Sequence, residues 1–220
     1  MPIYYIPEEL WFPPVEEAED GLVGIGGDLS SERLLLAYSN GIFPWFENDE
    51  EILWWSPDPR MVLFPEKFKI SKSLRQSIRN KGFELKIDFD FESVIHACSQ
   101  IQRPEGEGTW ITPGMHQAYM ELYHKGYAHS FEIYQNDRLV GGLYGVSLGK
   151  AFFGESMFSK VSDASKVALY HLINFAKQNN FLFIDAQVET EHLKRMGAEN
   201  ISRTQFISLL RKSQQSKPIL

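Results

Sequence analysis

The chain lacks most of the features that would place it outside the reducing interior of a cell. It has one cysteine, Cys98, which excludes a disulfide framework and a thiolate metal site. Its longest apolar stretch, residues 139–149, is about half as long as a membrane-spanning helix. The N-terminal residues lack a basic region followed by an apolar core, so we expect no signal peptide. These absences predict a cytoplasmic protein.

Two common kinds of ligand site are also missing from the sequence. The six histidines are scattered without the spacing of metal ligands, so we predict no bound metal. The glycine cluster over residues 21–30 lacks the Gly-Lys-Ser or Gly-Lys-Thr ending of a phosphate-binding loop. We therefore expect these glycines to form tight turns rather than a nucleotide site.

The composition is that of an ordinary globular protein, but its charge is unevenly distributed. The 220 residues are 43% hydrophobic and 23% charged, enough for one large domain or two small ones. Residues 1–59 hold 13 acidic and 1 basic residue, whereas residues 60–86 hold 8 basic and 2 acidic ones, within a net charge of −7. Such a basic segment can bind phosphate locally on an acidic protein, or it can be an ordinary solvated helix face.

The clearest structural pattern runs from Leu139 to Gln187. Residues 139–159 predict a hairpin with residues 147–150 at its tip, and residues 163–177 keep apolar side chains at helical spacing. Residues 181–187 form a short apolar strand. A strand that returns to the sheet through a helix lies parallel to the strand before the helix, so we expect a parallel pair here.

Polar residues occur inside these strands. Asp185 and Gln187 are two positions apart, which places them on one face of a regular strand, and Glu155 lies between large apolar residues. Burying a carboxylate without a partner is very costly, so each must be paired, hydrogen-bonded or functional. One such residue would favour a structural anchor, but three on adjacent strands favour a functional site.

Residues 41–46 and 52–60 are dense in aromatic residues and proline. Their tryptophans belong either to the core or to a surface that stacks a base.

A basic helix follows these segments. It is capped by Ser71 or Ser73, ends at Gly82, and points Lys72, Arg75 and Arg79 outward.

The order of predicted elements indicates a mixed α/β (α+β) protein. Residues 127–203 have the strand and helix order of an acetyltransferase-like (GNAT-like) domain. The turn over residues 159–166 contains no glycine, which weakens a coenzyme A site there. We expect a small N-terminal α/β domain, made of an aromatic- and glycine-rich region over residues 1–60 and a basic helix over residues 61–82. An acetyltransferase-like catalytic domain then covers residues 83–220.

Several short segments resemble one family, the leucyl/phenylalanyl-tRNA–protein transferases. They occur in the family's order through nearly the whole chain. They are Gly-Gly-Asp-Leu-Ser at 26–30, Gly-Ile-Phe-Pro-Trp-Phe at 41–46, Leu-Trp-Trp-Ser-Pro-Asp-Pro-Arg at 53–60, Gly-Thr-Trp-Ile at 108–111, Leu-Val-Gly-Gly at 139–142, Gly-Glu-Ser-Met-Phe-Ser at 154–159, Ala-Ser-Lys at 164–166, Ile-Asp-Ala-Gln at 184–187 and Met-Gly-Ala at 196–198.

The resemblance implies a bacterial cytoplasmic enzyme without a cofactor. Such an enzyme moves leucine or phenylalanine from leucyl-tRNA or phenylalanyl-tRNA onto proteins that begin with arginine or lysine, which marks those proteins for degradation by the N-end rule. The implied partners are the 3′ end and acceptor stem of the tRNA and the acceptor protein. The open alternatives are an acyl-coenzyme A-dependent N-acetyltransferase and a tRNA-binding module without activity.

The resemblance also implies roles for individual residues. Trp45 and Trp110 would stack the terminal adenosine, Glu155 would hold the α-amino group of the donor, and Asp185 with Gln187 would act on the attacking amine. Lys72, Arg75, Arg79 and Lys81 are the expected contacts to the tRNA backbone. The pocket for the transferred side chain would be lined by Leu143, Phe152, Met157, Leu169, Leu172 and Ile184.

These roles lead to a chemical expectation for Asp185 and Gln187. A glutamine carbonyl can accept a hydrogen bond from the amine, and Asp185 can orient that amide by accepting from its N–H. Gln187 is not a base, so a base, if one is needed, would be Asp185 with a raised pKa or the hydroxyl of the adenosine.

Overall fold

The computed structural model describes residues 3–101 and 111–215, which form a mixed α/β structure and confirm the predicted class. The helices are η1 (Val15–Glu17), α1 (Ser31–Ser39), η2 (Pro65–Lys67), α2 (Lys72–Asn80), α3 (Phe91–Ser99), α4 (Pro113–His124), α5 (Ala164–Gln178), α6 (Glu191–Arg195) and α7 (Arg203–Ser213). The strands are β1 (Tyr5–Ile6), β2 (Leu22–Gly26), β3 (Phe43–Pro44), β4 (Leu53–Trp55), β5 (Arg60–Leu63), β6 (Glu84–Ile87), β7 (Ala128–Gln135), β8 (Arg138–Leu148), β9 (Ala151–Ser159), β10 (Phe183–Gln187) and β11 (Glu199–Ile201).

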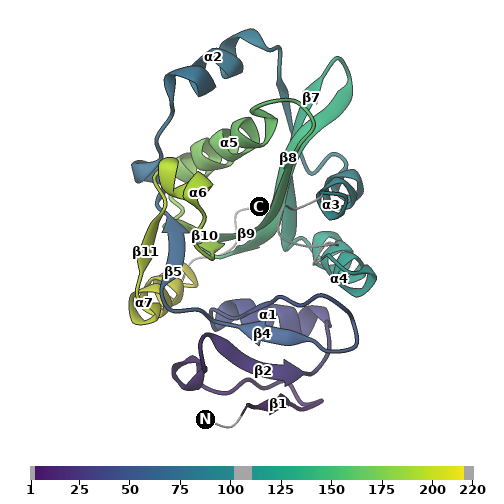
Figure 1. The fold of residues 1–220 in the computed structure, drawn as a ribbon, viewed down its shortest axis with the longest axis vertical. Helices are drawn as coiled ribbons and strands as arrows, with labels where there is room; N and C mark the ends of the chain where they lie inside the picture. The colour runs from purple at the N-terminus through teal and green to yellow at the C-terminus, as the bar shows by residue number, and fades with distance from the viewer. Residues whose placement is uncertain (1–2, 102–110, 216–220) are drawn as a thin grey trace.

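A seven-stranded sheet in the order β11-β5-β10-β9-β8-β7-β6 forms the centre of the described structure (Figure 1). The predicted hairpin is present as β8 and β9, and the predicted helix and strand follow as α5 and β10. β9 and β10 pair in parallel, as expected. The parallel pair therefore lies inside a sheet whose other pairs are antiparallel.

Each face of this sheet is covered by its own hydrophobic core. Helices α5 and α2 lie on one face, and α3 and α4 lie on the other (Figure 1). Helix α5 buries a stripe that includes Leu169, Leu172 and Ile173, and α2 adds Leu74 to the same core. The opposite core joins α3 and α4 to the N-terminal elements and to Phe206 of α7. The apolar spacing of the sequence thus buries α5 along its length.

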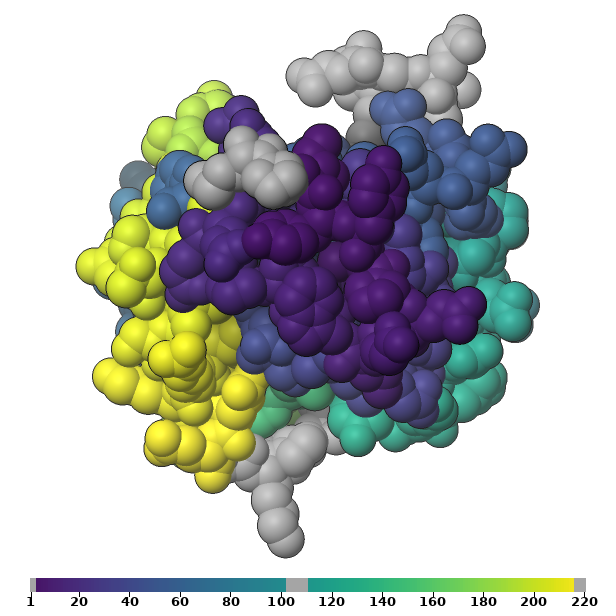
Figure 2. All heavy atoms as spheres, turned by 90° about the horizontal axis from the view of Figure 1, so that it is seen from below, coloured from purple at the N-terminus to yellow at the C-terminus, as the bar shows by residue number. Residues whose placement is uncertain are grey.

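The N-terminal residues form a second sheet, in the order β1-β2-β4-β3. Figure 2 shows that these residues cover one end of the molecule, beside the C-terminal helix α7. Most of the glycine cluster is strand β2, which ends at Gly26, and Gly21, with a φ of 91°, lies in the turn before it. Residues 61–82 contribute β5 to the seven-stranded sheet, and the division into a small domain and a catalytic domain stays a prediction.

The parallel strands β9 and β10 part from each other halfway along β9. Their pairing ends at Phe153 and Asp185, so Gly154 and the residues after it have no partner on that side. An unpaired strand needs other groups to satisfy its backbone and to fill the space beside it. The gap between β9, β10 and α5 is where a cavity forms.

Two glycines that face each other across β8 and β9 test this packing. A Cβ on Gly145 would lie 2.1 Å from the backbone oxygen of Phe153, whereas one on Gly154 would find its nearest atom, the oxygen of Asp185, at 3.5 Å. We predict that Gly145→Ala lowers the free energy of unfolding by about 1–3 kcal/mol or more, because backbone must move. Gly154→Ala should change it by well under half of that. Urea denaturation of both variants measures the difference, and equal effects would contradict it.

Candidate active site

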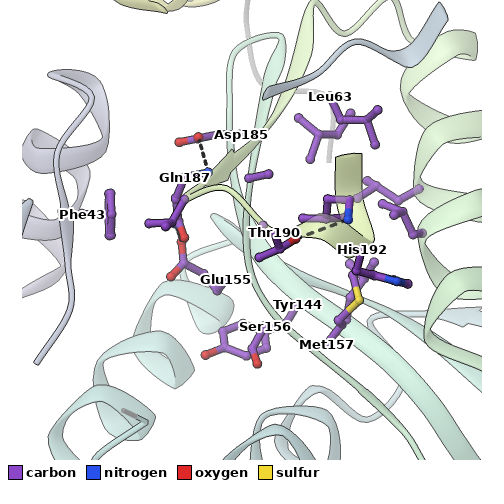
Figure 3. Close-up of a pocket in the computed structure, with 18 of the residues that line it drawn as sticks. Phe43, Leu63, Tyr144, Glu155, Ser156, Met157, Asp185, Gln187, Thr190 and His192 are labelled. Carbon is purple, nitrogen blue, oxygen red and sulfur yellow. Dashed lines mark hydrogen bonds between the residues drawn. The ribbon is translucent and has the colours of Figure 1, made fainter. Parts of the chain in front are cut away.

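A cavity of about 500 Å³ opens where β9 and β10 part (Figure 3). Its volume is in the range of sites that enclose a small ligand. Polar side chains gather on one part of its wall and apolar side chains on another. The lining residues are Phe43, Pro44, Trp45, Leu63, Leu143, Tyr144, Gly154, Glu155, Ser156, Met157, Leu169, Leu172, Ile184, Asp185, Ala186, Gln187, Val188, Thr190, His192 and Leu193.

A β-bulge places Glu155 at this cavity. Tyr144 pairs with Ser156 and Gly145 pairs with Gly154, which leaves Glu155 as the extra residue of β9. A bulge bends the strand and redirects its side chains. The carboxylate of Glu155 is therefore buried and turned toward the cavity and the helices beyond it.

Three hydrogen bonds hold the Glu155 carboxylate. The hydroxyl of Tyr38 donates to Oε1 at 2.8 Å and that of Tyr119 donates to Oε2 at 2.9 Å, and the Gln187 amide also donates to Oε1 at 2.9 Å. The two tyrosines, on α1 and α4, are themselves in hydrogen-bond contact. Burial, and then the charge of Glu155, raise the pKa of both tyrosines well above the usual value, so they remain protonated donors.

The pKa of Glu155 is shifted toward neutrality. Burial raises the pKa of its carboxyl to about 7, although the hydrogen bonds from Tyr38, Tyr119 and Gln187 lower it, and Asp185 raises it further. The net pKa shift is upward because the free energy lost when the charged carboxylate leaves water exceeds the free energy gained from these hydrogen bonds. Glu155 therefore changes its charge near neutral pH.

Asp185 forms a buried ion pair with Arg60. The guanidinium donates from Nε to Oδ1 at 2.9 Å and from a terminal nitrogen to Oδ2 at 2.6 Å, and both side chains are at most 1% exposed. Arg60 also donates to the backbone oxygen of Gly41 and lies between the rings of Phe43 and Phe206. Arg60 thus belongs to the core and not to the exposed basic segment in which the sequence places it.

A second bulge, at the end of β10, sets the position of Gln187. Asp185 pairs with Val62 and Gln187 with Met61, so Ala186 is the extra residue and the regular alternation expected from the sequence is broken. Gln187 has a φ of 63°, and its backbone N–H donates to Asp185 at 2.9 Å. Both side chains nevertheless line the cavity. The expected bond from the Gln187 amide to Asp185 is wrong, because that amide donates to Glu155.

The apolar part of the cavity contains most of the predicted pocket residues. Leu143, Met157, Leu169, Leu172 and Ile184 all line it, from four different elements. Leu63 and Leu193, which the sequence did not suggest, complete this wall, and Leu63 lies far from Glu155 in Figure 3.

Phe152 is not part of this lining. It is fully buried beside Phe131 in the α5-side core, at a point where β9 still pairs with β10.

One of the two predicted stacking tryptophans lines the cavity, and the other lies outside the described residues. Trp45 is 44% exposed, which is unusual for a tryptophan beside a cavity, and Trp55 donates to its backbone oxygen at 2.8 Å. Trp54, by contrast, is fully buried. Trp110 belongs to the segment 102–110, outside the described residues.

The predicted tRNA contacts lie on α2, away from the cavity wall. Ser71 caps this helix, and Lys72, Arg75 and Arg79 are exposed, as the sequence indicates. Lys81 is half-buried and donates to the backbone oxygen of Ser162 at 2.7 Å. The helix therefore offers three exposed cations that form no ion pair with any other described residue.

The described residues contain neither a metal-binding cluster nor a membrane-spanning helix. Among residues 3–101 and 111–215, no group of three histidine, cysteine or acidic side chains is placed to hold a metal ion. No helix in the same residues is long and apolar enough to cross a membrane. The predicted absence of a metal and the predicted cytoplasmic location stay predictions.

Sequence reasoning missed Arg60, Tyr38 and Tyr119, which hold the acidic side chains of the site. Arg60 lies 125 positions from Asp185, and the tyrosines lie 117 and 36 positions from Glu155. Helix periodicity places both tyrosines among core residues, and nothing local marks them as partners of a carboxylate.

Relatives identify the chain's family. The family model described as leucyl/phenylalanyl-tRNA protein transferase matches residues 62–211, and that of the N-terminal domain of the same family matches residues 27–58. The leucyl/phenylalanyl-tRNA–protein transferase of Syntrophobacter fumaroxidans is 54% identical over 96% of this chain and 90% of that protein. Its counterpart in Flavobacterium johnsoniae is 50% identical over 95% of this chain and 99% of that protein.

Solved structures with a similar fold share little sequence with the chain. An aminoglycoside acetyltransferase from an uncultured soil metagenomic sample has a TM-score of 0.37 at 11% identity, over 53% of this chain and 85% of that chain. These values are too low to transfer a function. The sequence relatives decide the family: the chain belongs to the leucyl/phenylalanyl-tRNA–protein transferases.

Proposed function

We propose that this protein moves leucine or phenylalanine from aminoacyl-tRNA to the α-amino group of proteins that begin with arginine or lysine. It would thus be an aminoacyltransferase that forms a peptide bond. The observation that carries the proposal is one cavity with an apolar wall beside the Glu155 carboxylate, in a chain of this family. An amino acid bound through its side chain and its amino group needs these two surfaces next to each other.

The donor amino acid fits the two parts of the cavity. Its apolar side chain would enter the wall of Leu143, Met157 and Leu172, and its α-ammonium group would bind Glu155. A pocket of this kind distinguishes side chains that differ by one methylene by about 1–3 kcal/mol. The pocket therefore selects apolar side chains of a certain size and shape rather than one single amino acid.

The tRNA would contact the protein at two places. The terminal adenosine would stack on Trp45, together with Trp110, and the backbone would contact the exposed cations of α2 with Lys81. Stacking on an aromatic ring is worth about 1–3 kcal/mol per base and does not depend on the base.

The reaction needs alignment more than it needs a strong base. The nitrogen of the acceptor attacks the ester carbon, the new C–N bond forms, and the C–O bond to the adenosine breaks. The nitrogen loses a proton and the released ribose oxygen gains one. An α-amino group titrates near pH 8, so part of it is neutral and ready to attack. Correct orientation alone can lower the barrier by several kcal/mol.

Asp185 and Gln187 would supply this alignment. The Gln187 amide donates to Glu155, so its carbonyl oxygen points the other way and can accept a hydrogen bond from the acceptor amine. Asp185 holds the backbone of Gln187 and is itself held by Arg60. In this arrangement Asp185 positions Gln187, and the proton passes to the ribose oxygen or to Glu155.

The proposal predicts a defined mass gain. Incubation with leucyl-tRNA should add one leucine residue to a peptide that begins with arginine and none to the same peptide beginning with alanine, as measured by mass spectrometry. No gain with leucyl-tRNA or phenylalanyl-tRNA would contradict the proposal. Acetylation in a parallel sample with acetyl-coenzyme A would then identify an acetyltransferase, and tRNA binding without any transfer would identify a binding module.

Asp185→Asn should separate turnover from affinity. The amide keeps the shape of the side chain but loses the charge that holds Arg60 and the Gln187 backbone. We expect kcat to fall on the order of 100-fold, because small misplacements cost that much, while the Kd for tRNA changes less than twofold. Asp185→Ala leaves the buried Arg60 charge without its carboxylate and should cost about 3–5 kcal/mol of stability as well. An equal loss of affinity and turnover in the asparagine variant would refute the role.

The pH profile should report on Glu155. A carboxyl with a pKa of about 7 loses its charge below that pH and no longer binds the donor ammonium. Below pH 8 the neutral fraction of the acceptor amine already falls tenfold per pH unit, so loss of the Glu155 charge should steepen the fall in transfer to about 100-fold per pH unit well below pH 7. Glu155→Gln should keep only the tenfold fall that belongs to the acceptor amine. A wild-type profile that does not steepen between pH 5.5 and 7 would contradict the assignment.

A further inference from the structure

The beginning of helix α5 lies next to the basic helix α2. Asp163, the residue before α5, accepts a hydrogen bond from Ser77 of α2 at 2.7 Å and lies 3.8 Å from the Lys81 ammonium. Lys81 also donates to the backbone oxygen of Ser162. These contacts fix the C-terminal end of α2 against the turn that joins β9 to α5.

The elements on either side of this turn both reach the cavity. Met157 of β9 and Leu169 of α5 line it, and His192 of α6 lines it as well. Burial, and then the positive charges of Lys166 and Arg195, lower the pKa of the His192 imidazole. Lys166, in the first turn of α5, and Arg195, at the end of α6, are thus close enough to the cavity wall to act on it.

Cations outnumber carboxylates along this route. Lys160 and Arg195 are exposed, and neither forms an ion pair with a described residue. Lys166 and Lys81 share one carboxylate, Asp163, at 2.8 Å and 3.8 Å. Lys194 is already paired with Glu189 and Glu191. Among the described residues, the cations from α2 to the cavity therefore exceed the carboxylates that pair with them.

The loop that follows the opposite wall of the cavity has the other sign of charge. Phe43 lies across the cavity from His192 in Figure 3, and the chain continues from Phe43 through Trp45 into the exposed loop of residues 47–51. This loop carries four carboxylates and no cation. A polyanion that approaches the cavity is repelled on that side and attracted on the side of α5 and α6.

We propose that Lys160, Lys166 and Arg195 bind phosphates of the single-stranded 3′ end of the donor tRNA, between α2 and the cavity. This inference rests on the proposed function. The aminoacyl ester is on the terminal ribose, so the phosphates of the last nucleotides must lie just outside the cavity when the amino acid is inside. Lysine and arginine are the side chains that bind such phosphates.

The test compares two donors that differ in their phosphates. The variant Lys160→Glu/Arg195→Glu changes two exposed residues that hold no ion pair, so its fold should be intact. We expect its KM for leucyl-tRNA to rise on the order of tenfold. With leucyl-adenosine, which carries no phosphate, its kcat/KM should stay within twofold of the wild type. The matched control is Arg211→Glu/Lys212→Glu, which reverses two exposed cations on α7, a helix that contributes nothing to the cavity.

Salt dependence gives a second readout on the same proteins. Each lost contact to a single-stranded phosphate should reduce the slope of log Kd against log salt by about 0.7, so the double variant should lose roughly 1.4. An unchanged KM and slope would overturn the inference, as would an equal loss with both donors. A wild-type protein that transfers no leucine would overturn the proposed function instead.

Discussion

The buried pair of Arg60 and Asp185 is the interaction on which the site depends. It joins the neighbouring strands β5 and β10 and reaches Gly41 of the N-terminal region through the same guanidinium. From Asp185 a chain of hydrogen bonds continues through Gln187 to Glu155, and from Glu155 to tyrosines on α1 and α4. Buried ion pairs contribute little net stability because desolvation offsets their attraction. The contribution of this pair is to orient Asp185, which holds the backbone of Gln187, whose amide in turn holds the Glu155 carboxylate.

The sequence predicts the secondary structure around the site better than the site itself. The hairpin, helix and strand from Leu139 to Gln187 follow from apolar periodicity, a local property, and they are present with small shifts at their ends. The two bulges at Glu155 and Ala186 do not follow from periodicity, because each depends on the partner strand. They decide where Glu155 and Gln187 point. Arg60 illustrates the same limit, since its role depends on a partner 125 residues away.

The resemblance to the family predicted the apolar wall of the cavity better than local sequence patterns could. Five of the six side chains expected in the apolar wall are there, because a family motif carries spatial information that no single strand contains. The sixth, Phe152, is buried in the core instead, at a point where β9 still pairs with β10. Phe152 pairs with Ser147 and Met157 with Leu143, so the extra residue in β9 puts both side chains on the α5 side of the sheet. Only Met157 lies beyond the point where the two strands part, and only Met157 lines the cavity.

The division of the cavity wall has a consequence for how donor specificity can change over time. The apolar side chains come from β5, β8, β9, α5, β10 and α6 and form no hydrogen bonds to the polar chain through their side chains. Each of them can be exchanged for another apolar residue while the carboxylates and the amide keep their partners. Substitutions in the apolar wall can therefore change which amino acid is transferred, while the arrangement of Glu155, Asp185 and Gln187 stays the same.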